Sequence, residues 1–366
     1  MIGFVGAARS LVVQLLAVAV GVVVSVALLA IVGTSPFDAL DALLRGAFGS
    51  DFALTQTVLK AIPLALCGLA VAVPLLMRLW NIGAEGQFHA GAIGATFAAL
   101  SAPGWPAAAL LPTMILAAMA AGALLALLAA LPRALWGVSE IITTLLLNYV
   151  AILAVAYLVT GPWRSSESFN FPVSDLFSTG AALPRLGSSQ LHVGVFFPVV
   201  AAAILLFVLR RSPWGFEVRM IGASPGAARV AGMSPAKNIV VVMLVAGSLA
   251  GLAGMVEVST TFGRLQQGIS PGYGYMAIVI AALAGGNVLA TLAAAFLFGG
   301  FVVGGFALQT LGVPQAFVLM LQGIILFCAL AGARLAGSGL IPWLPLRLRR
   351  SDAAAAAVEK EEPSIP

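Results

Sequence analysis

The chain has 366 residues, of which 61% are hydrophobic and only 8% are charged, and its formal net charge is +5. Soluble domains carry about 25% charged residues, so this chain lacks the polar surface that a water-soluble protein needs. Composition therefore excludes a soluble globular protein and predicts an all-α polytopic membrane protein. The basic residues lie at the ends of apolar runs, which is typical of membrane topology and speaks against nucleic-acid binding.

About ten apolar segments follow one another along the chain. Most are long enough as helices to cross a hydrocarbon core of about 30 Å. The eighth would be only about 20 Å long, so we expect some helices to be short or broken. The first is longer than a signal-peptide core and is interpreted as a retained anchor helix. The segments are Leu11–Gly33, Thr57–Met77, Gly83–Ser101, Pro106–Leu131, Glu140–Gly161, Leu191–Leu209, Ile239–Val258, Tyr275–Asn287, Val288–Leu308 and Pro314–Ala333.

The lysines and arginines predict how these segments are oriented. With a cytoplasmic N-terminus and ten crossings, only five of the 18 basic residues lie outside, namely Arg45, Lys60, Arg164, Arg185 and Arg264. The positive-inside rule therefore predicts that both termini are cytoplasmic. Two halves of five helices would then have opposite orientations, so an inverted repeat is a further hypothesis.

The polar stretches divide the chain. We expect a transmembrane region at 1–350, with a long basic inner loop at 210–238, and a disordered cytoplasmic tail at 351–366. Arg164–Gln190 is predicted to be an outer loop. Ser35–Gly49 predicts a short amphipathic helix on the outer interface, with Ser35 as N-cap and Pro36 at the first helical position. Its apolar stripe consists of Phe37, Leu40, Leu44 and Phe48.

Polar residues are concentrated between Asn81 and Gly91. Asn81 is a good N-cap, so the next helix is expected to start at Ile82, with Glu85 in the first turn, where the helix dipole favours an anion. His89 lies four residues further on, on the same face. The stretch is either a capped turn at the inner surface or a helix break at membrane depth that lines a substrate path.

Two other groups of polar residues can each be interpreted in two ways. The loop before Tyr273 and Tyr275 leads into a short helix, and the tyrosines either stack on a ligand or belong to an interfacial aromatic belt. Glu140, Thr144 and Asn148 form a polar stripe at intervals of four residues. Such side chains either hydrogen-bond neighbouring helices or line the path; packing is slightly favoured for Thr144 and the path for Asn148.

Cysteines and histidines give no sign of a metal site. Cys67 and Cys328 lie inside apolar segments and are interpreted as small buried hydrophobic residues. His89 and His192 are too few and too far apart in sequence to indicate metal ligation.

The stretch Leu59–Ala95 contains the pattern Asn-Ile-Gly-x-Glu-Gly-Gln at Asn81–Gln87 and resembles the signature region of nucleoside-type ABC importer permeases. These belong to the wider ribose/branched-chain amino acid permease superfamily. Sugar members tend to carry Gly-Ile-Asp-Leu-Ser here and amino-acid members Asn-Phe-x-x-Gly, and neither is present. Further matching stretches are Phe37–Ser50, Ser139–Ala151, Gly215–Met233 and Gly272–Gly286.

The resemblance implies a permease subunit in the cell inner membrane that has no catalytic residues and binds no cofactor itself. No lysine follows a glycine, so a P-loop is absent, and ATP and Mg²⁺ are expected on an ATP-binding cassette partner. A second homologous permease, giving a heterodimer, and an extracytoplasmic substrate-binding lipoprotein are also implied. The inner loop would dock the ATPase, although its charge alone could reflect topology. The implied coupling residues are Arg219, Gly222, Ala227, Ala228, Arg229 and Gly232.

The expected substrate is a nucleoside, with a simple sugar as the alternative. An ion-coupled secondary transporter that uses Glu85 is the less favoured hypothesis. Nucleosides need aromatic faces and amide or carboxylate groups, which the candidate path supplies. The candidate substrate-path residues are Asn81, Glu85, Gln87, Asn148, Tyr273 and Tyr275.

Overall fold

The computed structural model describes residues 35–338 except Asn170, together with residues 13, 16, 17, 19–25 and 27–29. The chain divides into two compact units, one formed by Met1–Ala27 with Met320–Pro366 and the other by Leu28–Leu319. Part of the predicted first segment, the end of the transmembrane region and the predicted tail at 351–366 lie outside the described residues.

The smaller unit pairs the first apolar segment with the last. Most of its described residues belong to a helix within Ala19–Leu29 and to the part of α13 from Met320 onward; α13 runs from Gln315 to Ser338. The hydroxyl of Ser25 donates to the carbonyl oxygen of Leu321 at 3.4 Å. Gly21 packs so closely on Ile325 and Cys328 that an added Cβ would lie 3.0 Å from atoms of each. The two apolar segments are therefore in direct contact.

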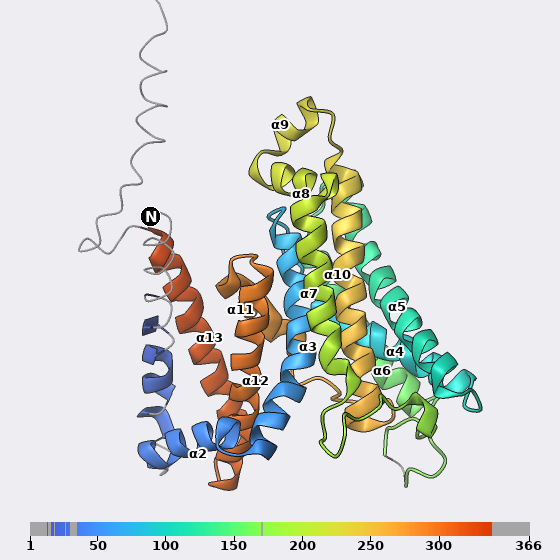
Figure 1. The fold of residues 1–366 in the computed structure, drawn as a ribbon, viewed down its shortest axis with the longest axis vertical. Helices are drawn as coiled ribbons and strands as arrows, with labels where there is room; N and C mark the ends of the chain where they lie inside the picture. The colour runs from blue at the N-terminus through green and yellow to red at the C-terminus, as the bar shows by residue number, and fades with distance from the viewer. Residues whose placement is uncertain are drawn as a thin grey trace, which may run out of the picture. The chain divides into compact units, whose positions relative to one another are not determined.

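The larger unit is helical throughout its regular structure (Figure 1). Isolated β-bridges occur only in loops among the described residues. The helices are α2 (Pro36–Phe48), α3 (Asp51–Leu75), α4 (Ala84–Ser101), α5 (Ala107–Trp136), α6 (Glu140–Thr160), α7 (Phe196–Arg211), α8 (Pro213–Ala223), α9 (Pro225–Val230), α10 (Pro235–Glu257), a π-turn (Val258–Phe262), α11 (Tyr273–Ala284) and α12 (Val288–Thr310).

Six helices in the described part of the chain are long and apolar enough to cross a membrane, and shorter apolar helices accompany them. The prediction of a polytopic all-α membrane protein is confirmed at that level. From α3 onward, the ends of the described helices differ from the predicted segments by up to six residues. The helix α3 begins at Asp51 rather than Thr57, and α7 begins at Phe196 after a 3₁₀ turn at Val193–Val195. The predicted short eighth segment is α11, with 12 residues.

Small residues allow α4, α5 and α10 to pack backbone against backbone. A Cβ added to Gly251 of α10 would lie 2.2 Å from the carbonyl oxygen of Ala118 in α5. A Cβ on Gly91 of α4 would lie 2.2 Å from atoms of Gly251 itself. This close approach maximises van der Waals contact where lipid offers no hydrophobic driving force.

The predicted amphipathic helix is α2. Pro36 is at its first position and Ser35 at the N-cap position, although the Ser35 side chain makes no capping hydrogen bond. Ala39 and Ala47 are buried, whereas Phe37, Leu44 and Phe48 are exposed. The exposed apolar stripe is what a helix at a lipid interface requires.

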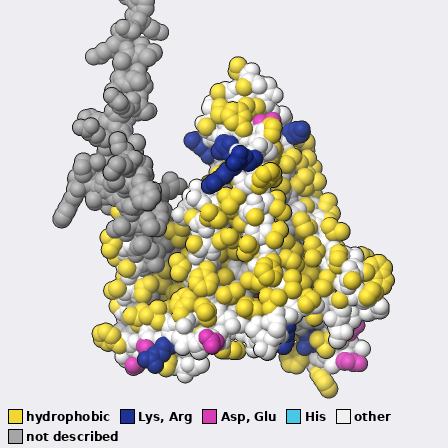
Figure 2. Space-filling view, viewed as in Figure 1, with side chains coloured by type: hydrophobic (Ala, Val, Ile, Leu, Met, Phe, Trp, Pro, Cys, Tyr) yellow, Lys and Arg dark blue, Asp and Glu magenta, His cyan; other side chains and the backbone are white. Residues whose placement is uncertain are grey.

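The surface is consistent with a membrane environment. Figure 2 shows hydrophobic side chains over the middle of the visible face and charged side chains toward its two ends. On α7, Val199, Val200, Ile204 and Phe207 are each more than half exposed. Helices α8 and α9 lie at one end of the larger unit, and the loop between α6 and α7 lies at the opposite end (Figure 1).

Candidate functional site

The chain breaks between α3 and α4 and turns back into the interior. Arg78, just after α3, has a φ of 59°, a left-handed conformation that is uncommon for a residue with a side chain. Asn81 is fully buried, and its Nδ2 donates to the carbonyl oxygen of Ala70 at 3.3 Å. Because Ala70 lies more than a turn before the end of α3, the break lies alongside α3 rather than beyond it.

A pair of amides holds the break together. Asn81 Nδ2 donates to Gln87 Oε1, and Gln87 Nε2 donates to Asn81 Oδ1, both at 2.9 Å. The expectation that Asn81 is the N-cap of a helix starting at Ile82 is wrong, since α4 starts at Ala84 and follows Gly83. The Asn81 side chain is instead engaged across the break, where two complementary amides satisfy each other away from water.

Asn148 of α6 holds the break from the other side. Its Oδ1 accepts from the backbone N–H of Gly86 at 2.8 Å, and its Nδ2 donates to the carbonyl oxygen of Ile82 at 2.9 Å. These are backbone groups that a helix break leaves without intrahelical partners. Glu140 and Thr144 of the same stripe are also buried, and Glu140 Oε1 accepts from the Trp80 N–H at 3.2 Å.

Glu85 lies where two helices begin. It is 2% exposed, it sits in the first turn of α4, and its Oε2 accepts from the Gly274 N–H in the first turn of α11 at 2.7 Å. Each helix N-terminus carries about half a positive charge, so the two together offset the carboxylate. A Cβ on Gly274 would lie 2.1 Å from the Glu85 nitrogen, which explains why a glycine is needed there.

The remaining predicted residues surround this point. His89 is buried on the same face of α4, with its Nδ1 2.7 Å from the Glu85 carbonyl oxygen and 3.8 Å from Glu85 Oε1. Tyr273 is fully buried against the Phe88 ring, at 5.8 Å between centroids, whereas Tyr275 is 38% exposed. The structure thus brings Glu85, His89 and Tyr273 together in the interior.

An ion pair lies next to these polar groups, and the sequence analysis did not assign its residues to a site. Lys60 Nζ of α3 lies 3.0 Å from Oε1 of Glu257, the last residue of α10. The Tyr273 hydroxyl donates to the same oxygen at 3.4 Å. Both charged residues interrupt apolar segments. This position could have marked them as candidate functional residues, since ionisable residues within membrane spans are rarely without a function.

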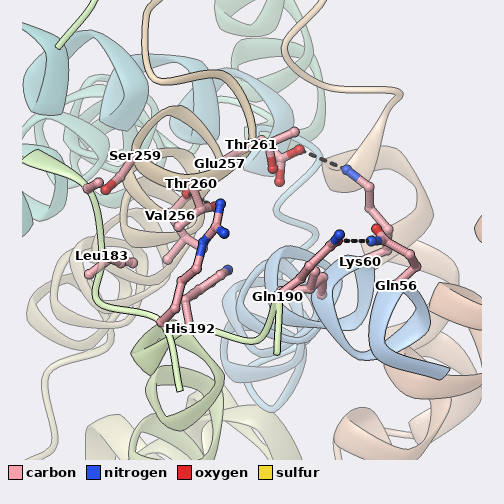
Figure 3. A pocket seen from close by; sticks show the side chains of 13 residues that line it. Gln56, Lys60, Leu183, Gln190, His192, Val256, Glu257, Ser259, Thr260 and Thr261 are labelled. Carbon is pink, nitrogen blue, oxygen red and sulfur yellow. Dashed lines mark hydrogen bonds and ion pairs between the residues drawn. The ribbon is translucent and has the colours of Figure 1, made fainter. Parts of the chain in front are cut away.

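A polar pocket opens beside this ion pair (Figure 3). It has a volume of about 290 Å³. Its walls come from α3, from the loop before α7, and from the end of α10 with the following π-turn, an irregularity often found at functional sites. The lining residues are Gln56, Leu59, Lys60, Ala182, Leu183, Arg185, Gln190, His192, Val256, Glu257, Ser259, Thr260 and Thr261.

His192 caps the 3₁₀ turn at the wall of this pocket. Its Nδ1 accepts from the Gly194 N–H at 3.1 Å, which places the ring proton of the neutral form on Nε2. Burial lowers the pKa of His192 from 6.5 to about 4. The ring is therefore uncharged near neutral pH.

At the opposite end of the unit, α8 and α9 form the centre of the basic loop. Ser212, Ser224 and Ser234 cap α8, α9 and α10 by accepting from backbone N–H groups. Gly222 is buried against α3, and a Cβ there would lie 1.9 Å from the Leu76 carbonyl oxygen. Among the other predicted coupling residues, Ala228 is buried, whereas Arg219, Ala227, Arg229 and Gly232 are exposed. Arg219 also donates to the Leu209 carbonyl oxygen.

The structure has long apolar helices, an interior break, and a second, short helix that begins at the same buried carboxylate. These features define a polytopic membrane protein with discontinuous helices. Residues 53–330 match the family described as the branched-chain amino acid transport system permease component. This match covers most of the chain, and the chain belongs to that family of ABC transporter permeases.

Several relatives align with this chain over most of their own length. A glucose ABC transporter permease protein, TsgB13 of Haloferax volcanii, is 39% identical over 85% of this chain and 84% of its own. A guanosine ABC transporter permease protein, NupP of Bacillus subtilis, is 32% identical over 87% and 93%. A nucleoside ABC transporter permease protein, NupB of Lactococcus lactis, is 28% identical over 87% and 90%.

A solved structure is also similar. It is PsaBC from Streptococcus pneumoniae in complex with Fab, at 16% sequence identity and a TM-score of 0.43, covering 81% of this chain and 95% of that one.

Proposed function

We propose that this chain is the membrane-spanning subunit of an ABC importer for nucleosides in the cell inner membrane. The observation that carries the proposal is the family match together with the two nucleoside-type relatives above, which align over nearly the whole chain. The interior break supports it, because helix N-termini that meet a polar interior are a recurrent way to build a transport site.

The proposed complex has four kinds of component. Beside this chain it contains a second, homologous permease, an ATP-binding cassette subunit that holds ATP and Mg²⁺, and an extracytoplasmic substrate-binding lipoprotein. The exposed face of α8 and α9 is the proposed contact with the ATPase. ATP binding and hydrolysis would shift the permease between two states of one path, for which this chain supplies no chemical step.

Residues of the break are the proposed substrate path. Asn81, Glu85, Gln87 and Asn148 are engaged with one another or with backbone groups in this structure. We propose that the transport cycle separates α11 from α4, which would free the Glu85 carboxylate from the Gly274 N–H to bind substrate beside the amides of the break. Tyr273 and Tyr275 would then move with α11 and supply aromatic faces for a base.

A simple sugar is the second candidate substrate, and the similarity to the glucose permease favours it. The deciding experiment is uptake by the reconstituted complex with a panel of labelled adenosine, guanosine, uridine, glucose and ribose. Saturable, ATP-dependent uptake of nucleosides supports the proposal. Uptake of glucose or ribose without nucleosides would assign the complex to sugars, and uptake of none of them would refute both assignments.

A further inference from the structure

The polar pocket beside the Lys60–Glu257 ion pair has the size of a site for a single small ring. Its volume of about 290 Å³ is at the low end of the range for ligand sites, which begins at about 300 Å³. Its lining contains no phenylalanine, tyrosine or tryptophan. The one aromatic ring in the lining is the imidazole of His192, which is largely buried, so the pocket suits a saturated, polar ring better than a base.

Several lining groups have hydrogen-bonding capacity left. Glu257 Oε1 is engaged by Lys60 and Tyr273, but Oε2 accepts no hydrogen bond from the described residues. The Lys60 ammonium has three donors, of which the ion pair uses one. The guanidinium of Arg185, which is exposed, and the hydroxyl of Thr261 have no hydrogen-bond partner in the described part of the chain.

The ion pair itself gives no preference for a charged ligand. Lys60 and Glu257 offset each other and His192 is neutral because its pKa is about 4, while the exposed Arg185 adds one positive charge at the wall. Between the two partners of the pair, the attraction of an ion by one is offset by its repulsion from the other. A pair of neighbouring hydroxyl groups fits both partners, because a hydroxyl can donate to Glu257 Oε2 and accept from Lys60.

We propose that this pocket binds the hydroxylated five- or six-membered ring of the substrate before the substrate reaches the interior break. The inference rests on the proposed function and deepens it, since a nucleoside and a simple sugar share such a ring. The position of the pocket supports this order, because Tyr273 connects Glu257 to the start of α11, where Gly274 meets Glu85. The ring hydroxyls would bind first at the ion pair and the base would remain outside the pocket.

The test uses a cysteine at the pocket in the complete complex. Thr261→Cys is introduced into a background with Cys67→Ala and Cys328→Ala, and the rate of labelling by a charged maleimide is measured with the binding protein present. Ser188→Cys, at an exposed position outside the pocket lining, is the matched control. The added compounds are uridine, adenosine, ribose, glucose, uracil and adenine.

We expect a transported nucleoside or sugar to slow labelling of Thr261→Cys severalfold, and ribose at high concentration to do the same. Uracil and adenine, which lack the hydroxylated ring, should not slow it, and none of the compounds should change labelling of Ser188→Cys. Unchanged labelling of Thr261→Cys by a compound that the same complex transports would overturn the inference and leave the proposed function intact. A complex that transports none of these compounds would overturn both.

A second measurement does not depend on cysteine chemistry. Arg185→Gln leaves the ion pair in place and removes one charged donor, so the KM for uptake should rise about tenfold, as expected for the loss of one charge-assisted hydrogen bond. The matched control is Arg264→Gln, an arginine outside the pocket lining, for which KM should stay unchanged. An equal KM in both variants would contradict a ligand contact at Arg185.

Discussion

Glu85 connects two helix N-termini through one side chain. Its backbone lies in the first turn of α4, and its carboxylate accepts from the first turn of α11. An acidic residue is costly at membrane depth unless a specific partner compensates for its charge. The two dipoles supply that compensation only while α4 and α11 stay together, so the charge of Glu85 favours the arrangement described here.

Replacing Glu85 with Gln should reduce uptake at least tenfold while leaving insertion and assembly intact. The glutamine oxygen can still accept from Gly274, but it carries no charge to offset the two helix N-termini, each of which is worth up to about 2 kcal/mol. Uptake and the yield of assembled complex are the measurements. Glu167→Gln, at an exposed loop position, is the control and should transport normally. Normal uptake by Glu85→Gln would contradict the proposed role.

Asn148→Ala should both weaken uptake and lower the midpoint of thermal unfolding. The change leaves the Gly86 N–H and the Ile82 carbonyl without their partner, and each buried unsatisfied group costs about 1–3 kcal/mol. Thr144→Val is the matched control, since Thr144 lies one turn away and bonds only carbonyl groups of its own helix. Binding of the ATPase should be unchanged in both variants, and equal unfolding midpoints would contradict the prediction.

His192 predicts a pH dependence of the loop before α7. Its pKa is about 4 in the folded protein and about 6.5 when exposed, so the fold favours the neutral ring. This contribution to stability is complete above about pH 6.5 and is lost as the pH falls from there toward 4. Hydrogen exchange of the segment 183–195, corrected for intrinsic rates, should therefore accelerate on acidification.

The control for this experiment is His192→Asn. Asparagine is a good N-cap and can accept from Gly194, but it does not titrate. The corrected exchange rate of the same segment should then change little with pH. A similar acceleration in wild type and His192→Asn would show that another group is responsible.

At the scale of helices, α8 and α9 each carry exposed and buried residues within a few positions of one another. Val230 is 92% exposed and Phe216 is 50% exposed, whereas Val218 and Ala228 are completely buried. Val230 and Phe216 are therefore available to the proposed ATPase contact. The buried neighbours fix this surface to the ends of α3 and α10, so the two short helices present one defined face.

Cysteines on this face should distinguish docking from internal packing. Ala227→Cys should crosslink to the ATPase in the assembled complex, whereas Ala228→Cys should not, because the side chain at 228 is buried. Gly226→Trp, at a position with open space around it, should leave insertion intact and uncouple ATP hydrolysis from uptake. Gly222→Trp is a poor test of docking, since it would clash with Leu76. Capture of the ATPase from 228 but not from 227 would contradict the proposed contact.

Hydrophobic patterning was sufficient to predict most helices, because long apolar runs bounded by Gly, Pro and Ser leave little choice in lipid. The hydrogen-bond and ion-pair partners of the polar residues were not predictable, since the tertiary fold decides which groups meet. Asn81 has all the local features of an N-cap, and only the fold brings Gln87 and Ala70 to its amide. Lys60 and Glu257 are 197 positions apart, so no spacing rule could pair them.

At the scale of the whole protein, the proposed function makes substrate choice depend on how the two polar regions would be combined. The pocket at Lys60 and Glu257 suits hydroxyl groups, and the break offers amides and a carboxylate together with the tyrosines of α11. A nucleoside could use the polar groups of both regions and stack its base on the tyrosines, whereas a free sugar has no base for those aromatic faces. Free ribose should therefore compete with labelled nucleoside uptake only weakly, with an inhibition constant at least tenfold above the nucleoside KM. Equal competition by ribose would move the complex to the sugar group.

The contact between Gly222 and Leu76 has a mechanical consequence. No side chain separates the backbone of Gly222 from that of Leu76. Because the two backbones are in direct contact, a displacement of α8 moves the end of α3 as well. The chain turns into the break directly after Leu76, and the tightly packed helices α4, α5 and α10 resist deformation behind it. The junction is therefore stiff, and under the proposed docking a force of the ATPase on α8 would reach the turn that precedes Asn81 instead of being absorbed by a flexible loop.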